Sequence, residues 1–342
     1  MIVDDSVVAR AVLSRMVETD GGFEIAAVAG TAEDAIDALA HVRVDIILLD
    51  LEMPGAGGLK MLPHILASSR GARVIVVSSL AEEGAEVTVA ALALGAADTL
   101  PKPGTSRFNG RFSEVLLGRL RALGHADRPA LQSEPARSSV PLRAMSVAPL
   151  ELLAIGASTG GIHSLGTLFQ NLPGSLGVPI LVTQHLPAPF MDVFARQIAT
   201  AARRGALIAQ DGMIALPDQI LIAPGDAHLT LERRGGPPLV RLDRRPVRSG
   251  CLPSLDPMLA SVGDIYGPAA VGVILSGMGR DGTEGAKQLV ERGGAIIAQD
   301  EASSAVWGMP RSVAEAGLAS AILPPDKIAR RVASRAGEQS WK

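Results

Sequence analysis

The chain has 342 residues, of which 47% are hydrophobic and 20% are charged, the composition of an ordinary globular protein with two domains or three small ones. Its net charge of −3 argues against sequence-independent nucleic-acid binding, and its single cysteine excludes an internal disulfide and a multi-cysteine zinc site. No apolar run approaches the ~20 residues of a membrane span, and no signal-peptide pattern opens the chain. We expect a cytoplasmic protein without membrane insertion.

Residues 1–123 alternate short apolar runs with amphipathic stretches, which indicates βαβ units on a parallel sheet. The predicted strands are 24–28, 44–49, 73–77 and 98–100. The predicted helices are 6–18, 32–41, 58–67, 84–94 and a last one near 111–123. Residues 124–149 hold four prolines and no hydrophobic periodicity, a composition typical of a flexible linker.

A second α/β pattern occupies residues 150–335. Its predicted strands are 151–155, 179–183, 219–223, 271–275 and 295–299. Its predicted helices are 161–171, 190–202, 255–261, 283–292 and 310–316. The sequence therefore predicts two doubly wound parallel-sheet α/β domains joined by a linker.

Polar side chains follow several strands of the first domain. Asp4 and Asp5 come directly after the opening apolar run, Asp50 ends the run that begins at residue 44, Ser78 ends the next, and Lys102 follows the last. The carboxyl ends of parallel strands share one rim, so three carboxylates can converge there and require a hard cation such as Mg²⁺. Helix N-capping is the alternative for any one of these acids, but five suitable residues at four strand ends favour a phosphoryl-transfer site.

These residues carry a family resemblance. Residues 1–103 resemble the receiver domain of a two-component response regulator through Val3-Asp4-Asp5-Ser6, residues 48–55 (LLDLEMPG), Val77-Ser78-Ser79 and Pro101-Lys102-Pro103. The resemblance implies phosphoryl transfer from a histidine kinase to Asp50. It implies further that Asp4, Asp5, Asp50 and the backbone carbonyl of Glu52 hold Mg²⁺, and that Ser78 and Lys102 contact the phosphoryl oxygens.

The first domain departs from that family in two places. The opening strand has only Met1-Ile2-Val3 where the family has several more apolar residues, so we expect missing ladder bonds there and a natural start upstream. Thr99 stands where the family commonly has an aromatic residue, so the mode of conformational signalling is left open.

The second domain opens with a strand that runs into Gly156-Ala157-Ser158-Thr159-Gly160-Gly161 and then a helix. Such a turn presents a side chain above the sheet edge beside backbone N–H groups, which suits an oxyanion or a phosphate. The match to G-x-S-x-G suggests a nucleophile. From this turn alone, a phosphate cradle is an equal alternative, although the dinucleotide and P-loop spacings are absent.

A serine nucleophile needs a base, and the base needs an orienting carboxylate. Of six histidines, His185 stands at a strand end, and His228 is a secondary candidate. Asp281 lies in a glycine-rich loop after a third strand, where N-capping of the next helix is the alternative reading. The trio Ser158, His185 and Asp281 favours catalysis, and its chain order differs from the Ser–Asp–His order of α/β-hydrolases. His41, His64, His125 and His163 are expected to be structural or solvated.

Residues 151–323 resemble the catalytic domain of bacterial chemotaxis receptor glutamate methylesterases. The shared segments are 156–161, 184–187 (QHLP), 222–225 (IAPG), 253–256 (PSLD), 275–282 and 307–310 (WGMP). The resemblance implies Ser158 as nucleophile, His185 as base and Asp281 as its orienter. It also implies that Thr159 positions the histidine and that the Met278 backbone N–H stabilises the oxyanion, with no cofactor for the ester reaction.

Taken together, the two resemblances predict an esterase activated by phosphorylation. It would demethylate glutamate γ-methyl esters on methyl-accepting chemoreceptors and deamidate receptor glutamines, with the chemotaxis histidine kinase as partner. The unphosphorylated receiver would obstruct the catalytic rim. One alternative is a phospho-dependent adaptor without catalysis, which has no need of an intact trio. Another is a DNA-binding regulator, disfavoured because the residues after 123 carry only 21 basic against 19 acidic side chains.

Overall fold

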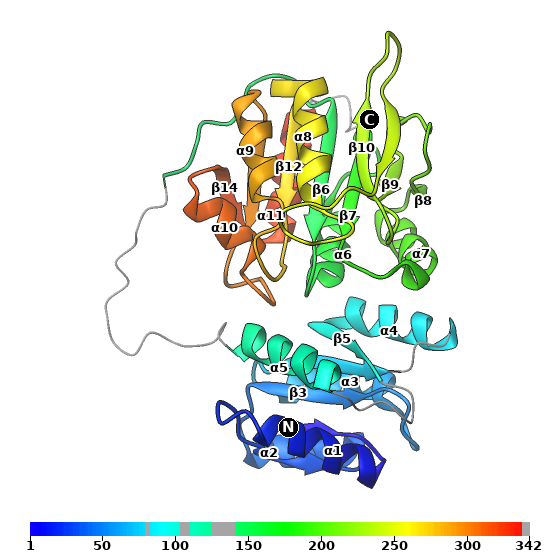
Figure 1. Ribbon diagram of the computed structural model, residues 1–342, viewed down its shortest axis with the longest axis vertical. Helices are drawn as coiled ribbons and strands as arrows, with labels where there is room; N and C mark the ends of the chain where they lie inside the picture. Colours follow the sequence, from blue (N-terminus) through cyan, green and yellow to red (C-terminus); the bar gives the residue numbers. More distant parts are fainter. Residues whose placement is uncertain (79–81, 103–109, 125–140, 337–342) are drawn as a thin grey trace. The chain divides into compact units, whose positions relative to one another are not determined.

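The structure is a computed structural model that describes residues 1–78, 82–102, 110–124 and 141–336 (Figure 1). The chain forms two compact units, residues 1–134 and 135–342. The boundary between them falls inside the stretch 124–149 for which a linker is predicted, and residues 125–140 of that stretch lie outside the described residues.

The first unit is a five-stranded parallel sheet in the order β2-β1-β3-β4-β5. Its strands are β1 (Ile2–Val3), β2 (Val28–Ala29), β3 (Ile46–Asp50), β4 (Arg73–Ser78) and β5 (Asp98–Pro101). Its helices are α1 (Val7–Glu18), α2 (Ala32–His41), α3 (Gly58–Ser68), α4 (Glu82–Leu94) and α5 (Gly110–Gly124). The strand order reverses between β1 and β3, and open α/β sheets bind ligands at such a switch point. The predicted doubly wound fold is confirmed.

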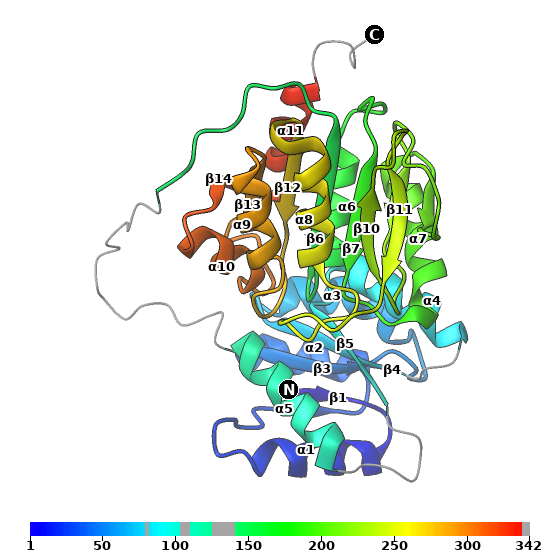
Figure 2. The same cartoon turned by 45° about the horizontal axis from the view of Figure 1, so that its top comes forward.

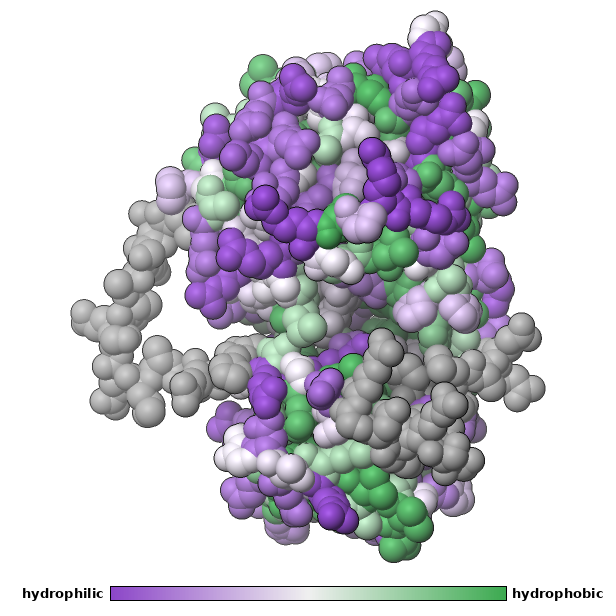
Figure 3. All heavy atoms as spheres, in the orientation of Figure 1, coloured by the Kyte–Doolittle hydropathy of each residue, from purple (hydrophilic) through white to green (hydrophobic). Residues whose placement is uncertain are grey.

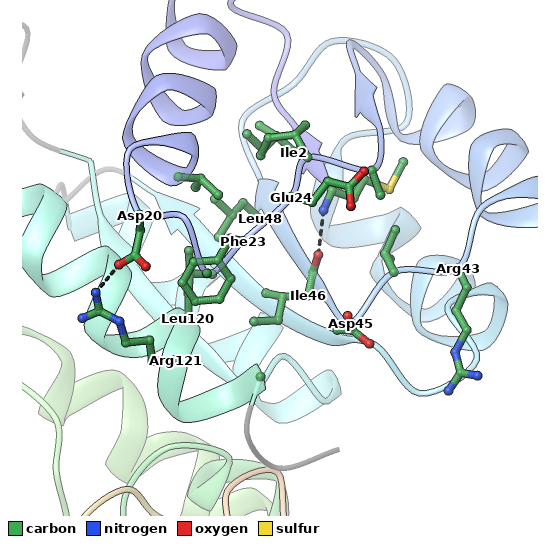
Figure 4. Close-up of a pocket in the computed structure, with 17 residues that line it drawn as sticks. Ile2, Asp20, Phe23, Glu24, Arg43, Asp45, Ile46, Leu48, Leu120 and Arg121 are labelled. Carbon is green, nitrogen blue, oxygen red and sulfur yellow. Dashed lines mark hydrogen bonds and ion pairs between the residues drawn. The ribbon is translucent and has the colours of Figure 1, made fainter. Parts of the chain in front are cut away.

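The first two strands of this sheet are short. β1 spans two residues, and of the strand predicted over 24–28 only Val28 lies in a strand, β2, although the Ala27 carbonyl accepts from the Ile2 N–H at 3.1 Å. A pocket of about 590 Å³ lies beside the start of β1, lined by apolar side chains such as Phe23 and Leu120 and by charged side chains such as Asp20 and Arg121 (Figure 4). The Met1 ammonium donates to the carbonyl of Ile46 at 2.8 Å. Burial lowers the pKa of this ammonium to about 6, although the negative charge of Asp45 acts to raise it.

The second unit contains a seven-stranded sheet in the order β14-β13-β12-β6-β7-β9-β8, parallel throughout. Its strands are β6 (Leu152–Ala157), β7 (Ile180–Gln184), β8 (Ala206–Ile208), β9 (Ile220–Ile222), β12 (Ala270–Ile274), β13 (Ala295–Gln299) and β14 (Ala319–Leu323). Its α-helices are α6 (Gly161–Asn171), α7 (Met191–Ala202), α8 (Leu255–Tyr266), α9 (Thr283–Glu291), α10 (Met309–Glu315) and α11 (Pro325–Ala336). Two short 3₁₀ helices, η2 (Ala188–Phe190) and η3 (Gly267–Ala269), precede α7 and β12.

Helices cover both faces of this sheet. α8 and α9 lie on one face, and α6, α7 and α11 on the other (Figures 1 and 2). An antiparallel hairpin of β10 (His228–Glu232) and β11 (Leu239–Asp243) packs beside α8. The core between sheet and helices is built from aliphatic side chains such as Leu181, Leu259 and Val313. The outer surface over α8 and α9 is largely hydrophilic (Figure 3).

Several elements of the second unit are absent from the prediction. β8 and β9 are three residues each, and only a strand at β9 was expected. β10 and β11 are hairpin strands whose residues are buried or partly buried, β14 is an edge strand of the sheet, and α11 packs against α6. The spacing of Ile328, Ala329, Val332 and Ala333, all buried, is a helical signal that the prediction did not use. Among the described residues, no helix is long and apolar enough to cross a membrane.

Candidate functional site

The first unit brings its predicted carboxylates together. One oxygen from each of Asp4, Asp5 and Asp50 lies within 4.8 Å of the others. Asp4 follows β1 and Asp50 ends β3, and these two strands pair directly with Val3 opposite Leu49. Asp4 and Asp50 are each 1% exposed. The convergence predicted from the strand ends is therefore present at the switch point of the sheet.

Lys102 neutralises part of this buried charge. Its Nζ donates to Asp50 Oδ2 at 2.5 Å and lies 3.4 Å from Asp4 Oδ2, an ion-pair distance rather than a well-formed hydrogen bond. Burial raises the pKa of Asp50, although the hydrogen bonds from Lys102 and from the backbone N–H of Glu52 oppose the shift. Burial disfavours the Lys102 ammonium, but its hydrogen bond to Asp50 prevails and raises the pKa of Lys102.

The donor set fits a hard divalent cation. Asp4 Oδ2 is buried and accepts no hydrogen bond from any described residue, so an oxygen ligand stands available inside the cluster. Asp4 Oδ1 accepts from the backbone of Ser6, and Asp50 Oδ1 from that of Glu52. Ser78 ends β4, but its side chain lies outside what the structure describes.

In the second unit, a tight turn joins β6 to α6 and carries Ser158. Gly160 has φ +73°, and a Cβ there would lie 2.3 Å from the Cβ of Ala305. A Cβ on Gly161 would lie 2.6 Å from both Ala157 Cβ and Gln184 Oε1. Glycine is therefore required at both positions, which keeps the turn short and leaves Ser158 at the strand's end.

Ser158 and His185 directly follow two adjacent strands. β6 and β7 pair in parallel with Ala157 opposite Gln184, the last residue of each strand, so Ser158 and His185 leave the sheet side by side. The His185 N–H donates to the carbonyl of Ala157 at 3.1 Å, and Gln184 Nε2 donates to the carbonyl of Ser158 at 2.9 Å. The hydroxyl of Ser158 makes no hydrogen bond to the described part of the chain, as is common for a nucleophile before substrate binds.

Asp281 reaches His185 from the loop after β12. Its Oδ2 lies 2.9 Å from His185 Nε2, and the carboxylate is 1% exposed. Three further donors hold it: Ser249 Oγ at 2.7 Å and Ser254 Oγ at 2.5 Å to Oδ1, and the Leu255 N–H at 2.7 Å to Oδ2. Burial disfavours the charge, but these donors and His185 prevail and lower the pKa of Asp281.

This bonding determines the imidazole tautomer. An ionised carboxylate accepts only, so His185 presents Nε2–H to Asp281 and keeps Nδ1 as its free acceptor. The ring nitrogen available to a neighbouring hydroxyl is therefore Nδ1. The N-cap of α9 is Gly282, and the Asp281 side chain does not cap this helix. The interpretation of Asp281 as a helix cap is therefore wrong.

The supporting residues of Asp281 were missed by sequence reasoning. Ser249 and Ser254 flank a short loop that precedes α8, and hydroxyls in loops are too common to indicate such a role. His228, the secondary histidine, is buried and supports this loop: its Nδ1 accepts from the Ser254 N–H and its Nε2 donates to the Arg245 carbonyl, both at 2.9 Å. His41, His64 and His163 are exposed, and His125 lies outside the described residues.

The predicted positioning groups stand in two loops beside Ser158. The Thr159 carbonyl accepts from Ser276 Oγ at 2.7 Å, which ties the β6–α6 turn to the loop after β12. In that loop Met278 is 45% exposed, and its backbone N–H donates to no described residue. A Cβ on the preceding Gly277 would lie 2.8 Å from Ser158 Cβ, so this loop passes directly beside the serine.

The two sites define a class of protein. A buried carboxylate cluster with a lysine at the switch point is the site of a receiver, and a serine beside a His–Asp pair at parallel strand ends is the site of a serine hydrolase. The family model described as "Response regulator receiver domain" matches residues 1–108, and "CheB methylesterase" matches residues 153–332. The protein is thus a response regulator joined to a hydrolase domain.

Known relatives are similar in sequence over nearly the whole chain. It is 43% identical over 341 residues to protein-glutamate methylesterase/protein-glutamine glutaminase 2 of Caulobacter vibrioides, covering 98% of both chains. It is 38% identical to the corresponding enzyme 1 of Paramagnetospirillum magneticum, over 96% of this chain and 93% of that one. The Thermotoga maritima CheB methylesterase catalytic domain superposes with a TM-score of 0.53 at 37% identity, covering 54% of this chain and 98% of that domain. The chain belongs to the CheB methylesterase family, which confirms the predicted enzyme class.

Proposed function

We propose that this protein hydrolyses γ-methyl esters of glutamate on chemoreceptors and that phosphorylation of Asp50 raises its activity. One observation carries the hydrolytic part: the buried Asp281 carboxylate accepts a hydrogen bond from His185, 2.9 Å away, and His185 and Ser158 directly follow adjacent strands. The names of the relatives supply the substrate class, a methylated protein glutamate.

The proposed reaction has two halves. Ser158 Oγ attacks the ester carbonyl while His185 Nδ1 takes the hydroxyl proton, and the imidazolium is stabilised by Asp281. The Met278 N–H is free to donate to the oxyanion, and Thr159, next to Ser158 in the turn, would help to position the histidine. Methanol leaves with the proton from His185. Water then attacks the acyl-enzyme, again through His185, and releases the glutamate carboxylate and Ser158.

The same acyl chemistry extends to glutamine. A side-chain amide in place of the ester loses ammonia rather than methanol, and the acyl-enzyme is identical. We propose this deamidation as a second activity of the site, in line with the double names of the relatives. The ester reaction as proposed uses no cofactor.

In the first unit, we propose that Asp50 accepts a phosphoryl group from the chemotaxis histidine kinase. Mg²⁺ held by Asp4, Asp5, Asp50 and the Glu52 carbonyl would offset the negative charge of the incoming group. Lys102, now 2.5 Å from Asp50, would bind a phosphoryl oxygen, with Ser78 as a second contact. We propose domain limits of 1–123, 124–149 and 150–335 and a cytoplasmic location for both reactions.

Methanol release from methylated receptor membranes tests the proposal. The full chain should release methanol, a small-molecule phosphodonor with Mg²⁺ should raise the rate, and Ser158→Ala should abolish release in both conditions. A Ser158→Ala protein that still supports the full effect would favour the phospho-dependent adaptor instead. No methanol from the wild-type chain, with or without phosphodonor, would contradict the hydrolase.

A further inference from the structure

A half-buried thiol stands beside the His185–Asp281 pair. One ring nitrogen of His185, the sulfur of Cys251 and one carboxylate oxygen of Asp281 all lie within 4.8 Å of one another. Cys251 is the only cysteine of the sequence. The hydrolytic mechanism uses the histidine and the aspartate but has no task for this thiol.

The loop that carries the thiol is fixed to the same carboxylate. Ser249 and Ser254, on either side of Cys251, both donate to Asp281 Oδ1, at 2.7 and 2.5 Å. The N–H of Leu255 adds a bond of 2.7 Å to Oδ2. The loop is therefore pinned at both ends, and the position of the sulfur relative to the pair is set by the fold rather than by a free side chain.

We propose that His185, Cys251 and Asp281 form a binding site for Zn²⁺ and similar thiophilic divalent cations. Imidazole, thiolate and carboxylate are the three ligand types of protein zinc sites, and three protein ligands leave a fourth position for water. Mg²⁺ prefers oxygen ligands and gains little from the sulfur, so the site is distinct in metal preference from the carboxylate cluster of the first unit.

The distances suit such an ion. Nitrogen and oxygen ligands about 2.0–2.1 Å from a tetrahedral zinc lie about 3.3 Å apart, and a sulfur at about 2.3 Å lies about 3.6 Å from each. His185 Nε2 and Asp281 Oδ2 are 2.9 Å apart, so the pair opens by a few tenths of an ångström. The sulfur, within 4.8 Å of the ligand atoms of both residues, moves inward by at most about 1.2 Å to reach the 3.6 Å separation.

Metal binding replaces protons. The cation takes the place of the Nε2 proton, which moves to Nδ1 because imidazole binds a metal as the neutral ligand, and it displaces the thiol proton, so one proton is released per ion bound. An imidazole whose Nε2 is held by the metal carries its proton on Nδ1 and therefore cannot act as the base for Ser158. Inhibition of ester hydrolysis thus rests on the proposed function, whereas binding of the metal does not.

Cobalt spectroscopy tests the binding on the intact chain. Co²⁺ added to the full-length protein should produce a near-ultraviolet thiolate-to-metal band that saturates at one ion per chain and is displaced by Zn²⁺. Because the chain has one cysteine, the band reports Cys251 alone, and Co²⁺ on the carboxylates of the first unit adds none. Ser158→Ala should bind Co²⁺ like the wild type.

Substitutions of Cys251 and His185 test whether each residue is a metal ligand. Cys251→Ser, a near-isosteric change, should lose the band and weaken Zn²⁺ binding by at least about 100-fold, since loss of outer-sphere partners alone costs about 10–100-fold. His185→Gln should keep the thiol but weaken the Co²⁺ affinity similarly. Absence of the band in the wild type, or unchanged Co²⁺ affinity in His185→Gln, would overturn the site.

An activity assay separates the two proposals. Zn²⁺ should inhibit methanol release by the wild type, a chelator should restore it, and Cys251→Ser should need at least about 100-fold more Zn²⁺ for equal inhibition relative to its own metal-free rate. A wild type that shows the cobalt band but never releases methanol would overturn the hydrolase and leave the metal site standing. Equal Zn²⁺ inhibition of wild type and Cys251→Ser would overturn the role of the thiol.

Discussion

The carboxylate of Asp281 accepts four hydrogen bonds inside the second unit, one of them from His185. These hydrogen bonds keep the Asp281 carboxylate ionised despite its burial, and they determine which ring nitrogen of His185 carries the proton. At the residue scale, the orientation of the base therefore depends on a carboxylate whose own position is held by Ser249, Ser254 and the Leu255 N–H.

Asp281→Asn should lower the rate of methanol release by roughly 10³–10⁴-fold with little change in KM, because the amide neither stabilises the imidazolium nor enforces the tautomer. Steady-state kinetics on methylated receptor membranes measure this. Retention of more than a tenth of the wild-type kcat would contradict the role given to Asp281.

Ser249 and Ser254 provide a matched pair of changes. Each alanine variant removes one hydrogen bond to Asp281, worth about 1.5 kcal/mol, so kcat should fall roughly tenfold with KM unchanged. Ser254→Ala also removes the N-cap of α8 and should lower the free energy of unfolding by about 1 kcal/mol, which Ser249→Ala should not. Equal kcat in wild type and both variants would show that the two hydroxyls do not position Asp281.

At the scale of elements, the β6–α6 turn and the loop after β12 present the catalytic groups at the carboxyl ends of their strands. Gly160→Ala introduces a Cβ 2.3 Å from that of Ala305 in a left-handed backbone conformation. We expect a destabilisation of at least about 1 kcal/mol in urea unfolding and loss of most activity, since the turn must shift with Ser158. Gly166→Ala, in the next helix, is the control because its Cβ meets no atom within 4 Å.

The first turn of α8 carries an acid with a perturbed pKa, Asp256, which contacts the start of α9. Asp256 Oδ1 accepts from the Gly285 N–H at 2.8 Å, and burial, with a further contribution from the negative charge of Asp281, raises the pKa of Asp256 to about 6. An acid whose pKa is raised on folding contributes most to stability below its unfolded value near 3.8 and loses that contribution as the pH rises through about 6. At neutral pH the ionised group is therefore destabilising.

Asp256→Asn cannot ionise and keeps the acceptor oxygen. The free energy of unfolding at about pH 7.5 should rise by about 1–2 kcal/mol, a figure reduced for the partial exposure of the group. The gain should shrink as the pH is lowered toward about 4. Urea unfolding at both pH values measures the gain in the free energy of unfolding. An equal gain at both would contradict the claim that burial raises the pKa of Asp256.

At the scale of the whole molecule, two sites in two units have to be coupled. We expect a phosphodonor with Mg²⁺ to raise methanol release by the wild type and to leave Asp50→Asn unchanged, since the amide accepts no phosphoryl group. Removal of Mg²⁺ by a chelator should abolish the stimulation but not the basal rate, because the ester reaction as proposed uses no metal. Stimulation of Asp50→Asn equal to that of the wild type would exclude Asp50 as the acceptor.

A shortened chain tests the direction of this coupling. A protein that begins at residue 146 should release methanol faster than the unphosphorylated full chain if the first unit restrains the second. The solved Thermotoga maritima catalytic domain, which covers a similar stretch, shows that such a domain forms without its receiver. A shortened chain no faster than the unphosphorylated whole would contradict restraint by the first unit.

Sequence alone determined the fold class, the long helices and the residues placed at strand ends. Periodicity indicated helices such as Ala32–His41 and Gly161–Asn171 with the bounds that the structure has. Polar residues directly after buried strands indicated Asp4, Asp50, Ser158 and His185. These signals are local, because a strand that ends in a polar residue can be recognised without its neighbours.

Only the tertiary structure decided which groups surround Asp281. Ser249, Ser254 and Cys251 lie 27–32 residues before it in the chain. Ser254 falls in the shared segment 253–256, but no local pattern indicates that any of the three lies beside Asp281. The short hairpin of β10 and β11 was missed for the same reason: it is stabilised by packing on α8. Hydrogen bonds to a buried carboxylate depend on how loops fold back over a sheet edge, and that is a property of long-range contacts rather than of any segment.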